Sequence, residues 1–335
     1  MKPKTMYIVL AVFAALIIIY IIQNVSTDKK PVSEAFTSLS EGIQRDEITG
    51  IKVFYPDAQD SALVLSKEGD SWIVESKYGV PAKETEINRL LDELADLKGE
   101  LRGDNPDLAA DLGLTDTTAA MLVVTGRDGN TLATYLLGNR GPNYRGVFIQ
   151  RAASDKMYLA NTNLRSTFGL YAEDSQPDSK KWVETKVFPY QKEELNRINI
   201  VSRNKSIELI SEEQPVPEGD TAQVFQSPKK EWKKGDISRG VSVEDKDINS
   251  LINSVINFRA TDVADPDKTD EYGFADPDYK VELTDPAGDI HTFIVGNQLP
   301  DDENSYYARV LGKDLVYIIN KSGFNNLFVT PFEKS

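Results

Sequence analysis

The sequence contains no cysteine in its 335 residues and only one histidine, His291. Without thiols the chain forms no disulfide, offers no thiolate to a metal and has no cysteine nucleophile. A single histidine excludes a site with several histidine ligands, and a Ser-His-Asp triad would depend on this one residue. No G-x-S-x-G pattern is present either. We therefore assign no catalytic residue, no metal and no cofactor from the sequence.

Positive charge is also scarce, because 38 lysines and arginines face 53 aspartates and glutamates, giving a net charge of −15 at pH 7. Nucleic-acid binding needs a basic face for the phosphates, so a nucleic-acid partner is not expected. An acidic surface more often reflects solubility than cation binding. The chain is 40% hydrophobic and 27% charged, which is typical of a globular protein, and its length allows two domains.

One apolar run, Met6–Ile22, extends over 17 residues without a charge. As a helix it would rise about 25 Å, at the short end of what spans a bilayer core. It has no polar face, which disfavours a buried core helix, and no clean small-x-small cleavage site follows it, which disfavours a signal peptide. We expect an uncleaved transmembrane anchor. The short basic N-terminus and the long acidic part that follows favour export of the C-terminal domains.

The most informative pattern is an internal repeat of about 160 residues. Trp72 and Trp232 lie 160 positions apart. Leu112-Gly113-Leu114 corresponds to Tyr272-Gly273-Phe274, and Leu137-Gly138-Asn139 corresponds to Val295-Gly296-Asn297. So long a period indicates two copies of a whole domain, since solenoid units are much shorter. The shared glycines are expected to supply positive φ angles at turns.

Each copy is expected to hold three strands, an amphipathic helix, four more strands and a short closing helix. Apolar residues at spacings of three and four predict the long helices at 84–98 and 243–258. The closing helices are expected at 163–168 and 321–328. This order indicates an α+β fold class: two tandem repeated domains, each a mostly antiparallel sheet with one amphipathic helix, after an N-terminal transmembrane helix.

The element order also sets the expected domain boundaries. They are a signal anchor at 1–23, a juxtamembrane linker at 24–45, a first repeat at 46–172, a linker at 173–190 and a second repeat at 191–330. An insertion in the second copy, 212–230, is rich in Pro, Glu, Gln and Ser and is expected to be a mobile loop.

The repeated unit resembles the DUF4340 family of bacterial membrane-anchored proteins of unknown function. The tryptophans, the glycine turns and the strand Tyr306-Tyr307-Ala308-Arg309 carry this resemblance. The last motif is degraded in the first copy, which reads Val147–Arg151. The resemblance spans 46–330 and implies a single-pass protein of the bacterial inner membrane with extracytoplasmic domains. By association it also implies an ABC-type exporter as partner.

Tyr306, Tyr307 and Arg309 are the residues that could offer a ligand aromatic and guanidinium surface. Strand alternation places Tyr307 and Arg309 on one face and Tyr306 on the other. Packing of the tyrosines with an extended arginine is the competing explanation.

Two acidic segments, Asp104–Asp107 and Ala264–Asp267, lie before the shared glycines and could hold calcium. Neither follows the order of a calcium-binding loop, however, so turn and capping roles are preferred. His291 is interpreted as an exposed strand residue.

We therefore expect an extracytoplasmic binding or assembly module, acting as an accessory part of an ABC-type export or envelope complex. The alternative is an extracytoplasmic hydrolase or carbohydrate-processing enzyme with its site between the two repeats. That alternative requires convergent Asp or Glu side chains with shifted pKa values.

Overall fold

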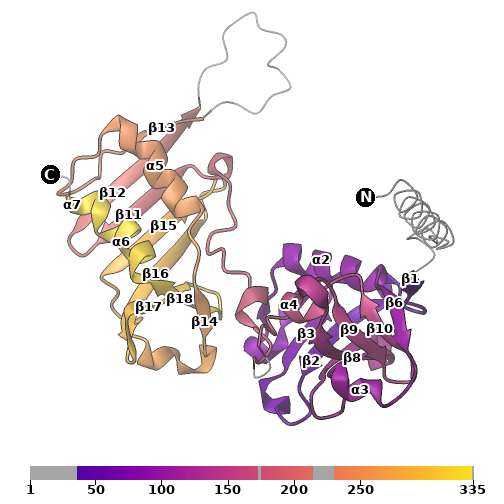
Figure 1. The fold of residues 1–335 in the computed structure, drawn as a ribbon. Helices are drawn as coiled ribbons and strands as arrows, with labels where there is room; N and C mark the ends of the chain where they lie inside the picture. The colour runs from indigo at the N-terminus through magenta and orange to yellow at the C-terminus, as the bar shows by residue number, and fades with distance from the viewer. Residues whose placement is uncertain (1–35, 173–174, 214–229, 334–335) are drawn as a thin grey trace, which may run out of the picture. The chain divides into compact units, whose positions relative to one another are not determined.

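The computed structural model describes residues 36–172, 175–213 and 230–333, which form two antiparallel sheets (Figure 1). The chain divides into two compact units. The first contains residues up to Ala62 together with Arg89–Pro177, and the second contains Leu63–Asn88 together with the chain from Asp178 onward. Residues 63–88 thus group with the second unit by their contacts, although they supply strands to the first sheet.

The first sheet has ten strands in the order β1-β6-β10-β9-β8-β7-β2-β3-β4-β5. Their bounds are β1 Phe36–Ser38, β2 Ile48–Phe54, β3 Leu63–Glu68, β4 Ser71–Val74, β5 Val80–Pro81, β6 Lys98–Gly103, β7 Ala120–Gly126, β8 Thr131–Arg140, β9 Val147–Arg151 and β10 Met157–Ala160. Three α-helices accompany these strands along the chain: α2 Glu84–Ala95, α3 Leu108–Asp111 and α4 Leu164–Thr167.

The second sheet has eight strands in the order β13-β12-β11-β15-β16-β17-β18-β14. Their bounds are β11 Arg197–Ser202, β12 Lys205–Glu213, β13 Lys230–Lys234, β14 Asp262–Ala264, β15 Tyr279–Thr284, β16 Ile290–Leu299, β17 Asp302–Val310 and β18 Val316–Asn320. The accompanying helices are α5 Asp245–Ile256, α6 Lys321–Phe328 and α7 Thr330–Glu333, and α5 lies across this sheet in Figure 1.

The two sheets share one strand order. Starting from β4, the first sheet runs β4-β3-β2-β7-β8-β9-β10-β6, and the second runs β13-β12-β11-β15-β16-β17-β18-β14. Each strand therefore has a counterpart at the same place along the other copy, and β1 and β5 extend the two ends of the first sheet. A duplicated domain requires such agreement, and a different order in the second sheet would have excluded it.

The long helices α2 and α5 each bury one apolar stripe, as their spacing predicts. Ile87, Leu90 and Leu94 of α2 are at most 1% exposed. In α5 the buried side chains are Ile248, Leu251, Ile252, Val255 and Ile256. Burying one such side chain fully contributes about 1.5–3 kcal/mol, so the stripes anchor each helix.

Two strands that follow the long helices, β6 and β14, were missing from the prediction. The β6 sequence Lys-Gly-Glu-Leu-Arg-Gly has no alternating apolar pattern, and β14 has only three residues. Backbone pairing with neighbours holds both in place: β6 pairs with β1 and β10, and β14 pairs with β18. The expectation of two helices in each copy, one amphipathic and one closing, was also too simple, because each copy has three α-helices in its described part.

Some predicted boundaries differ from the structure. Part of the expected linker 24–45 forms β1, which pairs with β6. The expected loop at 212–230 begins later, because β12 continues through Glu213, and residues 214–229 lie outside the described part. The proposed anchor Met6–Ile22 also lies outside the described residues. Among the helices that the structure does describe, none is long and apolar enough to cross a bilayer.

Candidate functional site

The predicted binding residues Tyr306, Tyr307 and Arg309 lie on β17, and the structure does not bring them together. Tyr306 stacks on Phe324 of α6, with ring centroids 4.4 Å apart. Tyr307 stacks on Tyr272 at 3.9 Å. The two tyrosines therefore face opposite sides of the sheet, as strand alternation predicted.

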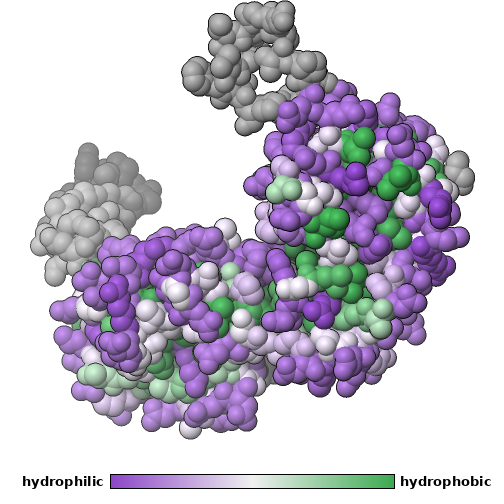
Figure 2. Space-filling model, turned by 180° about the vertical axis from the view of Figure 1, so that it is seen from behind, coloured by the Kyte–Doolittle hydropathy of each residue, from purple (hydrophilic) through white to green (hydrophobic). Residues whose placement is uncertain are grey.

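Arg309 lies on the Tyr307 side of the sheet. Its guanidinium carbon is 5.7 Å from the centroid of the Phe274 ring, and its Nη2 donates to the carbonyl of Lys313 at 3.0 Å. Figure 2 views the side of the second unit turned away from α5 and shows small hydrophobic patches between hydrophilic side chains. The contacts described for these three residues are contacts with neighbouring groups of the chain.

The repeated glycines and asparagines hold one turn in each copy. Gly113 and Gly273 have φ angles of 68° and 76°, as expected. Gly138 and Gly296 do not, and for them the prediction was wrong. A Cβ on either of these two would instead overlap the carbonyl oxygen of Leu112 or Tyr272. The next residue, an asparagine, donates its backbone N–H to that same carbonyl.

The two acidic segments form turns of the predicted kind. The Asn105 side chain accepts a hydrogen bond from the backbone N–H of Asp107 at 3.1 Å, and Asp265 accepts one from Asp267 at 3.0 Å. The residues that the structure describes contain no group of three or more His, Cys, Asp or Glu side chains placed to hold a metal ion. Asp265 thereby caps the 3₁₀ helix Pro266–Glu271, whereas the Asn105 oxygen closes the turn before α3, whose N-cap residue Asp107 makes no side-chain cap hydrogen bond.

His291 lies in β16 and is partly exposed. Its Nε2 is 3.5 Å from Oδ2 of Asp285, and its ring is 4.9 Å from that of Tyr190. These are contacts of a strand residue with its neighbours. Of the tryptophans, Trp182 is fully buried and Trp232 is 7% exposed, which agrees with packing roles.

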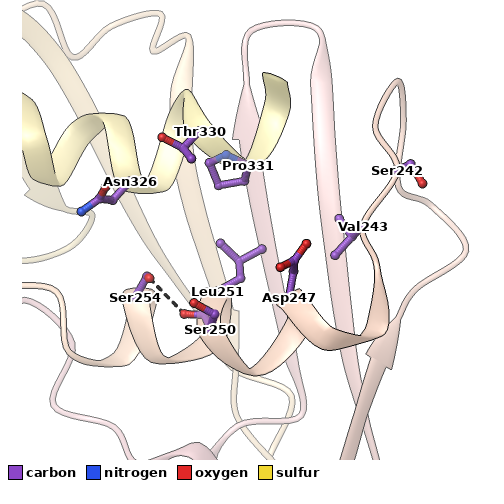
Figure 3. A pocket seen from close by; sticks show the side chains of 9 residues that line it. All are labelled: Ser242, Val243, Asp247, Ser250, Leu251, Ser254, Asn326, Thr330 and Pro331. Carbon is purple, nitrogen blue, oxygen red and sulfur yellow. Dashed lines mark hydrogen bonds between the residues drawn. The ribbon is translucent and has the colours of Figure 1, made fainter. Parts of the chain in front are cut away.

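A groove of about 290 Å³ lies between α5 and the C-terminal helices of the second unit (Figure 3). Asp247, Ser250 and Ser254 line it from α5, and Asn326, Thr330 and Pro331 line it from the opposite side. The Ser254 hydroxyl donates to the Ser250 carbonyl at 3.0 Å. The groove is open, and its hydroxyl, amide and carboxylate groups share the lining with Val243, Leu251 and Pro331, so it suits weak contacts of mixed character.

A larger cavity, of about 480 Å³, lies in the first unit. Its polar lining comes from the end of β2, the turn after α3, the end of β8, α4 and the segment after α4. It comprises Tyr55, Asp57, Thr117, Thr118, Asn139, Arg165 and Gln176. Arg165 is 7% exposed. Its Nη2 donates to the Tyr55 hydroxyl at 3.0 Å and to the Ala172 carbonyl at 3.2 Å. This cavity combines volume, a buried cation and several hydrogen-bonding groups.

Sequence reasoning missed Arg165, although a signal existed. The closing helix of the second copy, α6, buries Phe324, Leu327 and Phe328, whereas α4 buries Leu164, Arg165 and Thr167. A charge in one copy at a place where the other copy is apolar points to a role that only the first copy has.

Among the described residues, the carboxyl groups whose pKa the fold shifts are held in their charged form. Burial alone would raise the pKa of Asp262, but a hydrogen bond from Lys180 and the charge of Lys77 lower it overall. The pKa of Glu282 is likewise lowered against the effect of burial, by hydrogen bonds from Lys280 and Asn199. Burial raises the pKa of Tyr317 to about 12. These shifts all move the pKa away from neutral pH.

Comparison with known proteins identifies a family. No curated protein and no solved structure matches the chain. The family model described as "Domain of unknown function (DUF4340)" matches residues 72–277 and again residues 238–332. The second match runs from just before α5 to beyond α6, so it covers the second half of the second copy. Because these matches cover well over half of the sequence, the chain belongs to the DUF4340 family.

Proposed function

We propose that this protein is a membrane-anchored binding and assembly module of the bacterial inner membrane, with both repeats outside the cytoplasm. The apolar run Met6–Ile22 supports a single-pass anchor, because 17 uncharged residues are close to the length that a bilayer core requires. The acidic balance of the chain and the absence of cysteine from its sequence agree with an extracytoplasmic location.

One observation carries the proposal: the two copies repeat the residues that build the scaffold, while each has a polar cavity of its own. Gly113, Asn139 and their counterparts Gly273 and Asn297 hold equivalent turns. By contrast, the cavity at Arg165 and the groove at Asp247 lie at different places in the two copies. A duplicated scaffold with diverging surfaces is suited to holding different ligands or partners.

The partner we propose is a membrane protein of the ABC-exporter type, contacted by the anchor. Such a partner would place the two repeats beside an export or envelope complex. The association rests on the family resemblance, so the experiment must identify the partner without assuming it.

The hydrolase alternative receives less support. A general acid at neutral pH needs a carboxyl group whose pKa is raised towards the working pH. The shifted carboxyl groups Asp262, Glu282, Asp285 and Asp302 all have their pKa lowered. They are therefore held as carboxylates, which favours contact roles over proton transfer.

Location is tested by labelling a single introduced cysteine, since the natural sequence has none to react. Lys246→Cys, at a side chain that is 72% exposed, should react with a membrane-impermeant maleimide in spheroplasts. Lys4→Cys is the matched control and should react only after the membrane is opened. The reverse pattern would contradict the proposed orientation.

The partner is tested by affinity capture of the detergent-solubilised full chain, with mass spectrometry of what co-purifies. A photoreactive residue at Phe13 should crosslink to a protein with several membrane spans. Replacing the other residues of 6–22 by leucines, with the photoreactive residue kept at position 13, should keep the protein in the membrane and abolish that crosslink. Recovery of no stable protein neighbour from the wild type would overturn the assembly proposal.

A further inference from the structure

Three charged side chains are buried in the described residues, and one of them differs from the other two. Glu208 forms an ion pair with Arg197 at 3.3 Å, and Asp262 forms one with Lys180 at 2.9 Å. Arg165 has no carboxylate within 4 Å among the residues that the structure describes. Burying a charge without a counter-charge is costly, so an arginine in this state suits an anionic partner that comes from outside.

The bonds that Arg165 does make leave most of its donors free for such a partner. Both of its hydrogen bonds start from Nη2. Nε and Nη1 make none with the described part of the chain. A guanidinium carries five N–H donors in a planar fork, and that fork matches the two oxygens of a carboxylate. Arg165 is thus held by Tyr55 and Ala172 on one nitrogen while the other two stay available.

The same place in the second copy shows that the fold does not require this charge. There α6 follows β18 as α4 follows β10, and Phe324 packs in the interior against Tyr306, Tyr279 and Phe328. An apolar residue therefore satisfies the closing helix. A buried arginine at the corresponding helix is more simply explained by binding than by folding.

The remaining lining groups indicate what else the ligand carries. Asp57 is an exposed carboxylate on the cavity wall, suited to an ammonium group. Thr117, Thr118 and Asn139 offer both donors and acceptors. A cavity of about 480 Å³ falls within the range of small-molecule sites. We infer that the first repeat binds a small zwitterion, an amino acid or short peptide whose carboxylate meets Arg165 and whose amine faces Asp57.

The inference deepens the proposed binding role but needs no protein partner, so the two can fail separately. Isothermal titration calorimetry on the detergent-solubilised full chain should detect alanyl-alanine. Its C-terminal amide and its N-acetyl form, each lacking one of the two charges, should bind at least tenfold more weakly. Phosphate and acetate serve as anion controls and should also bind at least tenfold more weakly.

The matching protein variants are Arg165→Met, which keeps the volume without the charge, and Arg165→Lys, which keeps the charge without the fork. We expect at least tenfold weaker binding in the first and a smaller loss in the second. Tyr55→Phe removes the anchoring hydroxyl and should weaken binding less than Arg165→Met. If Arg165→Met unfolds, the comparison of the three peptides on the wild type still decides the question.

Several results would overturn the inference. They are equal binding of the peptide and its amide, unchanged binding in a folded Arg165→Met variant, and equal binding of phosphate. Absence of peptide binding to the wild type would do the same. Binding that appears only in a Glu173→Gln/Asp174→Asn variant would mean that the chain's own carboxylate is the anion, and the proposal of an external ligand would be wrong.

Discussion

The closing helices α4 and α6 follow equivalent strands in two sheets that share an order of eight strands, yet they bury different side chains. In the second unit the α6 residue Phe324 meets three aromatic rings, with centroids 4.4 to 5.4 Å apart. In the first unit α4 buries the guanidinium of Arg165 and the hydroxyl of Thr167. Phe324 of α6 thus adds to the apolar core of its unit, whereas Arg165 of α4 places a charged side chain in the corresponding position.

The difference shows which parts of the domain the fold constrains. The turn between the short helix and the strand is the same in both copies, down to the glycine that lets the backbone approach. The closing helix is not constrained in this way, because burial of either an aromatic cluster or a hydrogen-bonded arginine keeps the same topology. Divergence is therefore expected at the closing helix and at the cavity beside it.

The sharpest test of this comparison replaces one side chain in each closing helix. Phe324→Ala should lower the free energy of unfolding of the second unit by about 3–5 kcal/mol, because it leaves a cavity among aromatic rings. Arg165→Met should change the first unit by only about 1 kcal/mol, because an apolar residue of similar size replaces a buried charge.

Amide hydrogen exchange read by mass spectrometry measures the two units separately. Each variant leaves the other unit as its internal control. If Arg165→Met lowered the free energy of unfolding as much as Phe324→Ala does, the arginine would be needed for folding. The contrast between the two closing helices would then be wrong.

The shared turn should respond equally in the two copies. Gly138→Ala and Gly296→Ala each place a Cβ against a backbone carbonyl that cannot move aside. We expect each substitution to lower the free energy of unfolding by about 2 kcal/mol, which is within the range for overpacking. Unfolding in urea measures this change.

Gly312→Ala is the control for this pair, because its φ of 78° is strained for alanine but its Cβ would meet nothing within 4 Å. It should cost about 1 kcal/mol or less. If Gly296→Ala lowered the free energy of unfolding no more than Gly312→Ala does, close approach of the backbone would not be the reason for the repeated glycine.

Much of the fold was predictable because its signals are local. The predicted helix 321–328 agrees with α6, and α2 begins at the predicted Glu84. The strands expected after each long helix are present, and β7 buries every second residue, as an alternating apolar pattern predicts. These elements carry their own pattern of burial, so a single sequence is enough to find them.

The missing elements and the cavity depend on contacts that no local pattern encodes. β6 is held by β1 and β10, which lie about 60 positions away along the chain on either side. Comparison of the two copies marks Arg165 as a charge where α6 is apolar, but the sequence does not show that this side chain is buried and hydrogen-bonded to Tyr55. The candidate residues Tyr306, Tyr307 and Arg309 were placed on the correct faces, but their aromatic neighbours come from distant segments.

The buried charges also differ in their expected response to pH. Burial opposes ionisation of Asp262, but Lys180 and Lys77 outweigh it, so its pKa in the folded chain lies below the unfolded value of about 3.9. A lowered pKa stabilises the fold fully above the unfolded pKa, and this stabilisation is lost as the pH falls through the folded value. Asp262→Asn should therefore cost about 1.5 kcal/mol at neutral pH and progressively less below about pH 4.

Arg165→Met provides the contrast, because arginine side chains do not titrate in this range and its effect should stay constant. Urea unfolding at a series of pH values measures both variants. If the difference in free energy of unfolding between wild type and Asp262→Asn did not decrease in acid, the ion pairs of Asp262 would contribute nothing to stability.

The smallest expected effect concerns the turns before the shared glycines, where the two copies use different residues for one task. Asn105→Ala and Asp265→Ala each remove an oxygen that accepts a backbone N–H two residues ahead. Each substitution should lower the free energy of unfolding by about 0.5–1 kcal/mol, as the loss of one hydrogen bond does. Millimolar calcium should leave the unfolding temperature of the wild type unchanged, because a bound ion would raise it in proportion to the logarithm of its concentration. A calcium-dependent rise in the unfolding temperature that Asp265→Ala abolishes would instead make this segment an ion site in the second copy. Because Asn105 is uncharged, the two turns would then not be equivalent in function.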